Sequence, residues 1–192
     1  MSELPHVLIE RVSISRLIEP APSASQRQQI FQTALRAPDH ARLRPWRFLV
    51  VEGDGRVELG ELMARAMQTE DPTLSQQQLD KLRSNPLRAP LVIVLIARIS
   101  EHPKVPAVEQ RLSLACATQN MLLAAHALGF GAIWRTGPVT FSRAFAEGLG
   151  LVGHEEVLGF LYLGTPAAEV PLPDLPEIDQ HFEAWPRQTS GS

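Results

Sequence analysis

Arginine stands next to hydroxyl side chains at two points where the chain leaves a regular element. Arg11 ends a predicted helix and is followed by Ser13, and Arg135 ends a predicted strand and is followed by Thr136. A guanidinium donates two parallel hydrogen bonds to a phosphate, and a hydroxyl adds a third. The pattern therefore indicates a ligand that carries phosphate, although arginine near a helix C-terminus is also favourable without any ligand.

A second concentration of positive charge lies in residues 34–53, ALRAPDHARLRPWRFLVVEG, where four arginines surround His40 directly before an apolar run. The whole chain has a net charge of −3, so this charge is a local feature. A domain that binds nucleic acid is expected to be strongly basic, with aromatic residues among the charges. The sequence has neither property, and we expect no nucleic-acid partner.

Standard catalytic motifs are absent from the sequence. It contains no P-loop, GxSxG, HExxH or GxGxxG pattern, and its six histidines have no metal-ligand spacing. The one cysteine, Cys116, lies among apolar residues of a predicted helix, where we expect a core residue and not a nucleophile. A single cysteine excludes an intrachain disulfide, and the N-terminus shows no leader pattern, so we expect a cytoplasmic protein without metal or membrane span.

The helices and strands that position these side chains can be predicted from alternating sequence patterns. We expect them to form one domain over residues 1–168. Strands are predicted at residues 47–52, 91–97, 132–135 and 157–163. Helices are predicted at residues 5–11, 25–36 with Ser25 as N-cap, 56–67, 75–84, 107–128 and 141–149. The unbroken run LVIVLIA at 91–97 indicates a strand that is covered on both faces.

The longest predicted helix, residues 107–128, is apolar around nearly its whole circumference from Leu112 onward, and Gly129 ends it. A helix that is apolar on all sides has to be covered on all sides. One sheet covers a single face, so other helices or a second subunit must cover the rest. In a domain of this size we favour a homodimer.

Residues 169–192 form a predicted extended tail, because the prolines at 171, 173 and 176 exclude a helix and a central strand. Such a tail either hangs free or lies along a neighbour. Its apolar side chains, among them Leu175, Phe182 and Trp185, favour the second arrangement.

Five blocks of the chain, in this order, resemble the nitroreductase family of FMN-dependent oxidoreductases, and in particular its small, compact bacterial branch. The blocks are RVS, LRAPDHARLRPWRFLVVEG, RAPLVIVLIA, GFGAIWRTG and GFLYLGTP, and the resemblance covers about residues 4–166. It implies an α+β fold with a central, mainly antiparallel sheet flanked by helices. It also implies that the long apolar helix lies at a dimer interface, where FMN binds.

The resemblance assigns cofactor-binding roles to nine positions. Arg11, Val12 and Ser13 match the segment that holds the FMN phosphate and ribityl chain, and Trp134, Arg135 and Thr136 match a second flavin segment. Arg36 and His40 match positions that reach the flavin of the other subunit, and Ala124 matches a position linked to the nicotinamide cofactor. We expect no catalytic side chain, since the flavin itself performs the chemistry.

Three features depart from the family pattern. Val12 stands where a second arginine is usual, and Arg42 and Arg44 stand where larger relatives carry Asn and Gln. The C-terminal arm that wraps the partner in larger relatives is shorter here, and Arg135 is a candidate to replace its phosphate-binding residues.

The resemblance implies an enzyme that takes hydride from NAD(P)H and reduces a small flat acceptor such as a nitroaromatic or a quinone. The alternative is a flavin-binding storage or sensory protein without turnover.

Overall fold

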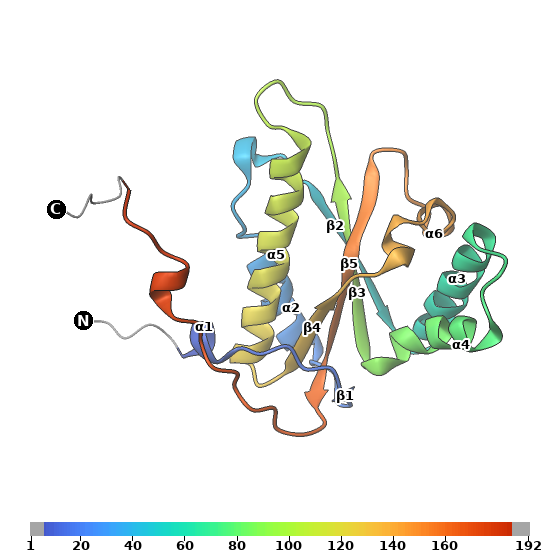
Figure 1. The fold of residues 1–192 in the computed structure, drawn as a ribbon, viewed down its shortest axis with the longest axis horizontal. Helices are drawn as coiled ribbons and strands as arrows, with labels where there is room; N and C mark the ends of the chain where they lie inside the picture. Colours follow the sequence, from blue (N-terminus) through green and yellow to red (C-terminus); the bar gives the residue numbers. More distant parts are fainter. Residues whose placement is uncertain (1–5, 186–192) are drawn as a thin grey trace, which may run out of the picture.

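An antiparallel sheet forms the centre of the molecule, with helices on both of its faces (Figure 1). The structure is a computed structural model, and it describes residues 6–185. The strands are β1 (Leu17–Ile18), β2 (Trp46–Glu52), β3 (Leu91–Arg98), β4 (Gly131–Arg135) and β5 (Glu155–Pro166). They follow the order β1-β5-β3-β2, β4 also pairs with β5, and every pairing is antiparallel. The predicted α+β class and antiparallel sheet are confirmed.

Helices α2 (Ala24–Ala34) and α5 (Ala107–Ala127) cover one face of the sheet. Helices α3 (Gly55–Glu70) and α6 (Arg143–Gly148) cover the other, and α4 (Gln76–Ser84) packs outside α3. The short α1 (Val7–Glu10) lies beside α5. Single 3₁₀ turns complete the connections: η1 (His40–Arg42), η2 (Asn85–Arg88), η3 (Pro138–Phe141) and η4 (Ile178–Gln180).

Strand β3 is buried on both sides, as its apolar run predicts. Leu91, Ile93 and Leu95 point into the core beneath α5, while Val92 and Val94 point into the core beneath α3. All five are fully buried. Because successive side chains of a strand point to opposite faces, one apolar run supplies both cores.

The predicted N-cap of α2 is wrong, because Ser23 caps this helix and Ser25 lies inside it. Ser23 Oγ accepts from the backbone N–H of Gln26, and Gln26 Oε1 accepts from the backbone N–H of Ser23 at 2.9 Å. Ser23 with Gln26 and Ser25 with Gln28 both have the spacing that a capping box needs, and the structure forms the box at the first pair.

Helix α5 ends as predicted, and its exposed side chains lie on one stripe. Gly129 has a φ of +81°, and the N–H of Phe130 bonds to the carbonyl of Ala125, which closes the helix. Val108, Leu112 and Cys116, spaced four residues apart, are all exposed. The prediction of Cys116 as a core residue is therefore wrong for the single chain, since residue 116 lies on the face that neither the sheet nor α2 covers.

The tail runs away from the sheet past α1 (Figure 1), and its apolar side chains do not pack against the core. Phe182 and Trp185 are among its exposed side chains. Residues 186–192 of the predicted tail lie outside the described residues. Within residues 6–185, no helix combines the length and apolar character that crossing a membrane requires.

Candidate functional site

The segment between α1 and β1 lies between β4 and the end of β5. The N–H of Ile14 donates to the carbonyl of Ala132 at 3.0 Å, and the carbonyl of Arg16 accepts from the N–H of Ala167, also at 3.0 Å. Arg11, Val12 and Ser13 directly precede Ile14. The structure thus brings the first predicted segment alongside the strand that carries Trp134 and Arg135.

Arg11 is the residue of this segment whose bonding is incomplete. It follows α1 as the C-cap, with extended backbone, and its Nη1 is buried. Among the described residues, this Nη1 is the one buried side-chain nitrogen or oxygen without a hydrogen-bond partner. Burying a donor unpaired costs about 1–3 kcal/mol, and more for a charged group. An anionic oxygen at this point would remove that cost.

Trp134 is fixed on β4 by an irregularity in the neighbouring strand. The pairing of β3 with β5 shifts between Leu95 and Ile96, so that Leu158 has no partner in this ladder. The carbonyl of Leu158 accepts from Trp134 Nε1 at 3.4 Å. A Cβ atom on Gly159 would lie 2.4 Å from Nε1, so the indole has room only because residue 159 is glycine.

Arg135 and Thr136 line a cavity of about 480 Å³ between α3 and α4 on one side and β4, β5 and η3 on the other. Its walls combine apolar side chains with Lys81, Arg88 and Arg135, and the described lining residues include no carboxylate. The apolar and neutral lining residues are Met63, Met67, Leu74, Gln78, Leu82, Asn85, Gly137, Pro138, Val139, Phe160 and Tyr162. The cavity thus suits a flat, largely apolar ligand that carries negative charge.

The pKa of Tyr162, which also lines this cavity, depends on the same buried and positively charged surroundings. Burial raises the pKa of its phenol, and the positive charges of Arg135 and Arg88 offset only part of that rise. The phenol is therefore a neutral hydrogen-bonding group on the cavity floor at neutral pH.

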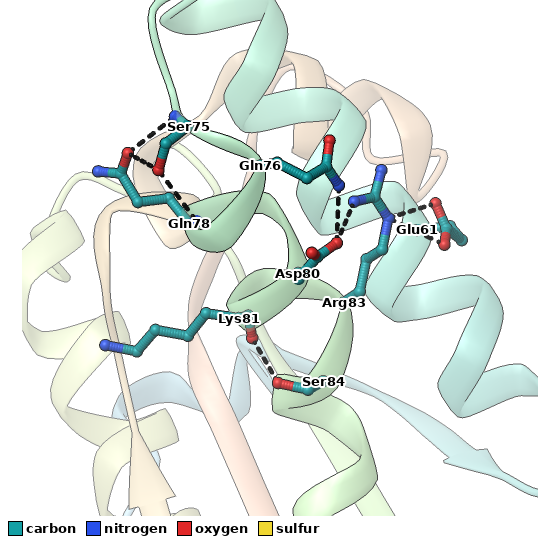
Figure 2. Close-up of polar contacts among 8 residues, drawn as sticks. All are labelled: Glu61, Ser75, Gln76, Gln78, Asp80, Lys81, Arg83 and Ser84. Carbon is teal, nitrogen blue, oxygen red and sulfur yellow. Dashed lines mark hydrogen bonds and ion pairs between the residues drawn. The ribbon is translucent and has the colours of Figure 1, made fainter.

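The sequence interpretation missed Lys81 and Arg88. Helix α4 is held against α3 because Arg83 Nε donates to both oxygens of Glu61, at 3.0 and 3.1 Å, and Arg83 also pairs with Asp80 (Figure 2). The ammonium group of Lys81 points away from these acids in the same view. In the sequence, Lys81 is a cation on the side of α4 opposite to the ion pairs of Arg83. That position indicates a cavity residue only when the packing of α4 against α3 is known.

The remaining predicted residues lie elsewhere in the chain. Arg36 lines a separate hollow near the end of α2, and His40 Nδ1 lies 2.8 Å from Glu109 Oε2 at the start of α5. Ala124 is partly buried on α5 and packs against the core. Of the predicted residues, Arg135 and Thr136 line this cavity, and Arg11, Ser13, Arg36 and His40 do not, so within one chain the predicted site is divided.

An antiparallel sheet with helices on both faces is the fold that the resemblance implies, and the sequence comparisons agree with it. The model of the Nitroreductase family matches residues 8–165, and the chain belongs to this family. The predicted resemblance and the prediction of an oxidoreductase of this family are confirmed.

Relatives in the compact branch share much of the sequence. The "Putative NAD(P)H nitroreductase YdjA" of Escherichia coli K12 is 44% identical over 163 residues, covering 83% of this chain and 86% of its own. A "Putative NAD(P)H nitroreductase" of Haemophilus influenzae is 38% identical over 160 residues, with the same coverage.

Solved structures share the fold. A nitroreductase-like protein from Bacillus cereus superimposes with a TM-score of 0.82 at 23% identity, over 96% of both chains. A "putative nitroreductase in complex with fmn" from Desulfovibrio desulfuricans has a TM-score of 0.72 at 24% identity, over 95% of this chain and 98% of its own.

Proposed function

We propose that this chain is an FMN-dependent oxidoreductase that takes hydride from NAD(P)H and reduces a small flat acceptor, such as a nitroaromatic or a quinone. Family membership supports this proposal, as do the names of the relatives from E. coli and H. influenzae. The observation that carries it is the buried, unpaired Nη1 of Arg11 in a segment that matches the family's phosphate-binding element.

The residues present fit FMN. Arg11 and Ser13 would hold the phosphate, since a buried guanidinium nitrogen and an exposed hydroxyl are available there. Arg135 and Thr136 would contact the ribityl chain or ring edge at the mouth of the cavity, whose apolar walls suit a flat ring system. Val12 would contribute its backbone.

When bound, FMN supplies the centre that accepts hydride and passes on two electrons. The chain's own part is binding and electrostatics. Trp134 is fixed by Leu158 and Gly159 and packs against the core beneath α5, where it would keep water from that side of β4. Lys81, Arg88 and Arg135 create a positive field in the cavity, which favours ligands whose negative charge increases on reduction.

The division of the predicted residues within one chain supports a site completed by a second copy. Arg36 and His40 would contact the flavin of the partner subunit, and Val108, Leu112 and Cys116 would be covered in the dimer. Ala124 is a weaker candidate for nicotinamide contact, since it packs against the core.

The test is the absorption spectrum of the purified protein, followed by anaerobic addition of NAD(P)H. We expect a flavin spectrum that bleaches with the donor and recovers on adding a nitroaromatic. Arg11→Ala should weaken FMN binding about ten- to a hundredfold, whereas Arg65→Ala, at an exposed arginine of α3 that has no ion pair within residues 6–185, should not. A protein that binds no FMN contradicts the proposal, and a flavin that does not bleach supports storage or sensing.

A further inference from the structure

A second hollow, of about 670 Å³, lies where α2 passes through η1 into β2. Arg36, Arg42 and Arg44 line it together with Asp39 and Trp46. It is separate from the cavity of Arg135 and Thr136, with which it shares no lining residue.

The three guanidinium groups have no internal partner. Within residues 6–185, no hydrogen bond or ion pair involves the guanidinium groups of Arg36, Arg42 or Arg44. Nearby, Arg47 is fully engaged, because its Nε and Nη2 donate to the two oxygens of Glu155 at 2.9 and 2.8 Å. The chain thus pairs one arginine of this stretch, and three others with unpaired guanidinium groups line the same hollow.

The backbone of this loop is held in an unfavourable conformation. Ala41, Arg42 and Arg44 have φ values of +61°, +55° and +49°, in the left-handed region that residues other than glycine rarely adopt. Asp39 stabilises the turn, since its Oδ1 accepts from the N–H of Leu43 at 3.0 Å and its Oδ2 from the N–H of Arg44 at 2.8 Å. Backbone strain that the surroundings enforce in this way is concentrated at ligand clamps.

The charge balance selects the ligand. With Arg36 assigned to the flavin, the guanidinium groups of Arg42 and Arg44 supply two positive charges, which match the dianion of a phosphomonoester, while both oxygens of Asp39 accept from backbone N–H groups. Arginine forks also fit phosphate oxygens in pairs. Two molecules of the proposed reaction carry a phosphomonoester: FMN at its 5′ position and NADPH at its 2′ position. NADH carries none.

We propose that Arg42 and Arg44 bind the 2′-phosphate of NADPH and thereby select NADPH over NADH as the hydride donor. The proposal rests on the proposed function for the identity of the donor. The FMN phosphate is the weaker choice, because the unpaired Nη1 of Arg11 already provides for it in a different segment.

The experiment measures binding of two nucleotides that differ by one phosphate, 2′,5′-ADP and 5′-AMP, by calorimetry on the purified protein without turnover. The variants are Arg42→Asn and Arg44→Asn, because asparagine tolerates a positive φ, with Arg65→Asn as the control. Arg42→Lys and Arg44→Lys keep the charge and lose the fork.

We expect the parent to bind 2′,5′-ADP at least tenfold more tightly than 5′-AMP. Each asparagine variant should lose about tenfold of the 2′,5′-ADP affinity and none of the 5′-AMP affinity, with partial recovery in the lysine variants. The same variants should raise the KM for NADPH and leave the KM for NADH and the Kd for FMN unchanged. Thermal melts should match those of the parent.

Equal binding of the two nucleotides by the parent would overturn the proposal, and so would an equal loss in the Arg65→Asn control. A loss of FMN affinity in the Arg42 and Arg44 variants would overturn it in favour of the cofactor phosphate. If the asparagine and lysine variants melt at lower temperatures than the parent and lose the same share of affinity for both nucleotides, the substitutions affect only folding and the proposal is wrong. Bleaching of the flavin by NADH and NADPH at equal rates contradicts this pocket alone, whereas bleaching by neither contradicts the proposed function.

Discussion

The indole of Trp134 lies over the backbone of Gly159 so closely that no other residue fits there. An added Cβ would lie 2.4 Å from Trp134 Nε1 and 2.6 Å from the carbonyl oxygen of Arg135. Gly159 also has a φ of +143°, which side-chain-bearing residues avoid. The strand that carries two predicted flavin-binding residues is thus positioned by a glycine on its neighbour.

Gly159→Ala should therefore displace Trp134 and Arg135 together. We expect a loss of at least about 2 kcal/mol of folding stability, from backbone strain and overlap, and a weaker FMN complex. Thermal melts and fluorescence titration with FMN measure the two effects. Gly153→Ala is the control, because nothing lies within 4 Å of a Cβ there. Equal behaviour of the two variants would show that Gly159 does not position the site.

Arg135→Ala should weaken FMN about ten- to a hundredfold, since a hydrogen bond to a charged group contributes roughly 1.5–3 kcal/mol. Arg135→Lys should restore only part of the affinity, because lysine keeps the charge and loses the bidentate geometry. Dissociation constants from flavin fluorescence quenching give the comparison. If the flavin-free Arg135→Ala protein already melts well below the parent, or binds FMN equally well, Arg135 has a structural role.

The architecture could be predicted from the sequence because its signals are local. The LVIVLIA run and the glycine at 129 identify β3 and the end of α5 without knowledge of the tertiary structure. The N-cap of α2 was missed by two residues, since Ser23 and Ser25 are each followed by a glutamine three residues later and the sequence pattern does not distinguish them. Cys116 was placed in the core because its sequence neighbours are apolar, but exposure depends on which face of α5 the sheet covers.

The candidate site was harder to predict, because it joins segments that are far apart in the chain. The resemblance gave Arg11 and Arg135, but Lys81 and Arg88 enter only through the packing of α4 against α3. The left-handed turn at residues 41–44 has no glycine to reveal it, and the Asp39 carboxylate that stabilises it bonds to backbone groups. Contacts of this kind leave no periodic pattern.

The exposed stripe of α5 predicts a homodimer. Leu112 is 58% exposed in the single chain, and a charge there would have to be buried if a second copy covers this face. Leu112→Asp should give a monomer of about half the parent mass in sedimentation experiments at micromolar concentration. Val57→Asp, at a residue of α3 with 51% exposure on the other side of the sheet, should leave the mass unchanged. A parent protein that is already a monomer with FMN bound would exclude the dimer.

Glu155 makes the stability of the fold sensitive to acid. Its side chain is only 6% exposed, and burial alone would raise the pKa of the carboxyl. Hydrogen bonds from Arg47 and from the N–H of Val152, together with the charge of Arg98, lower this pKa below its ordinary value. The folded state then releases this proton more readily than the unfolded state. The stabilisation is full above the unfolded pKa of about 4.3 and is lost as the pH falls through the lower folded value.

Melting temperatures measured between pH 7 and pH 3 should therefore fall on the acid side, and Glu155→Gln should reduce that slope while lowering stability at pH 7 by about 1–3 kcal/mol. Glu156→Gln is the control, because its pair with Arg111 is 41–43% exposed and contributes little. An unchanged acid slope in Glu155→Gln would assign the pH dependence to other carboxylates.

Arg36 and Arg11 are predicted to act on one flavin from two different chains. If this is right, a heterodimer of an Arg11→Ala chain with an Arg36→Ala chain has both changes at one flavin site and none at the other. Two affinity tags isolate this heterodimer, and we expect it to bind one FMN with the affinity of the parent.

The reverse control joins a chain that carries both substitutions to an unchanged chain, which places one change at each site and should leave no site intact. If Arg36 instead serves the flavin of its own chain, the two heterodimers exchange results: the first binds FMN weakly at both sites and the control retains one parental site. Flavin stoichiometry under tight-binding conditions therefore decides between the arrangements, without depending on how much either substitution weakens binding.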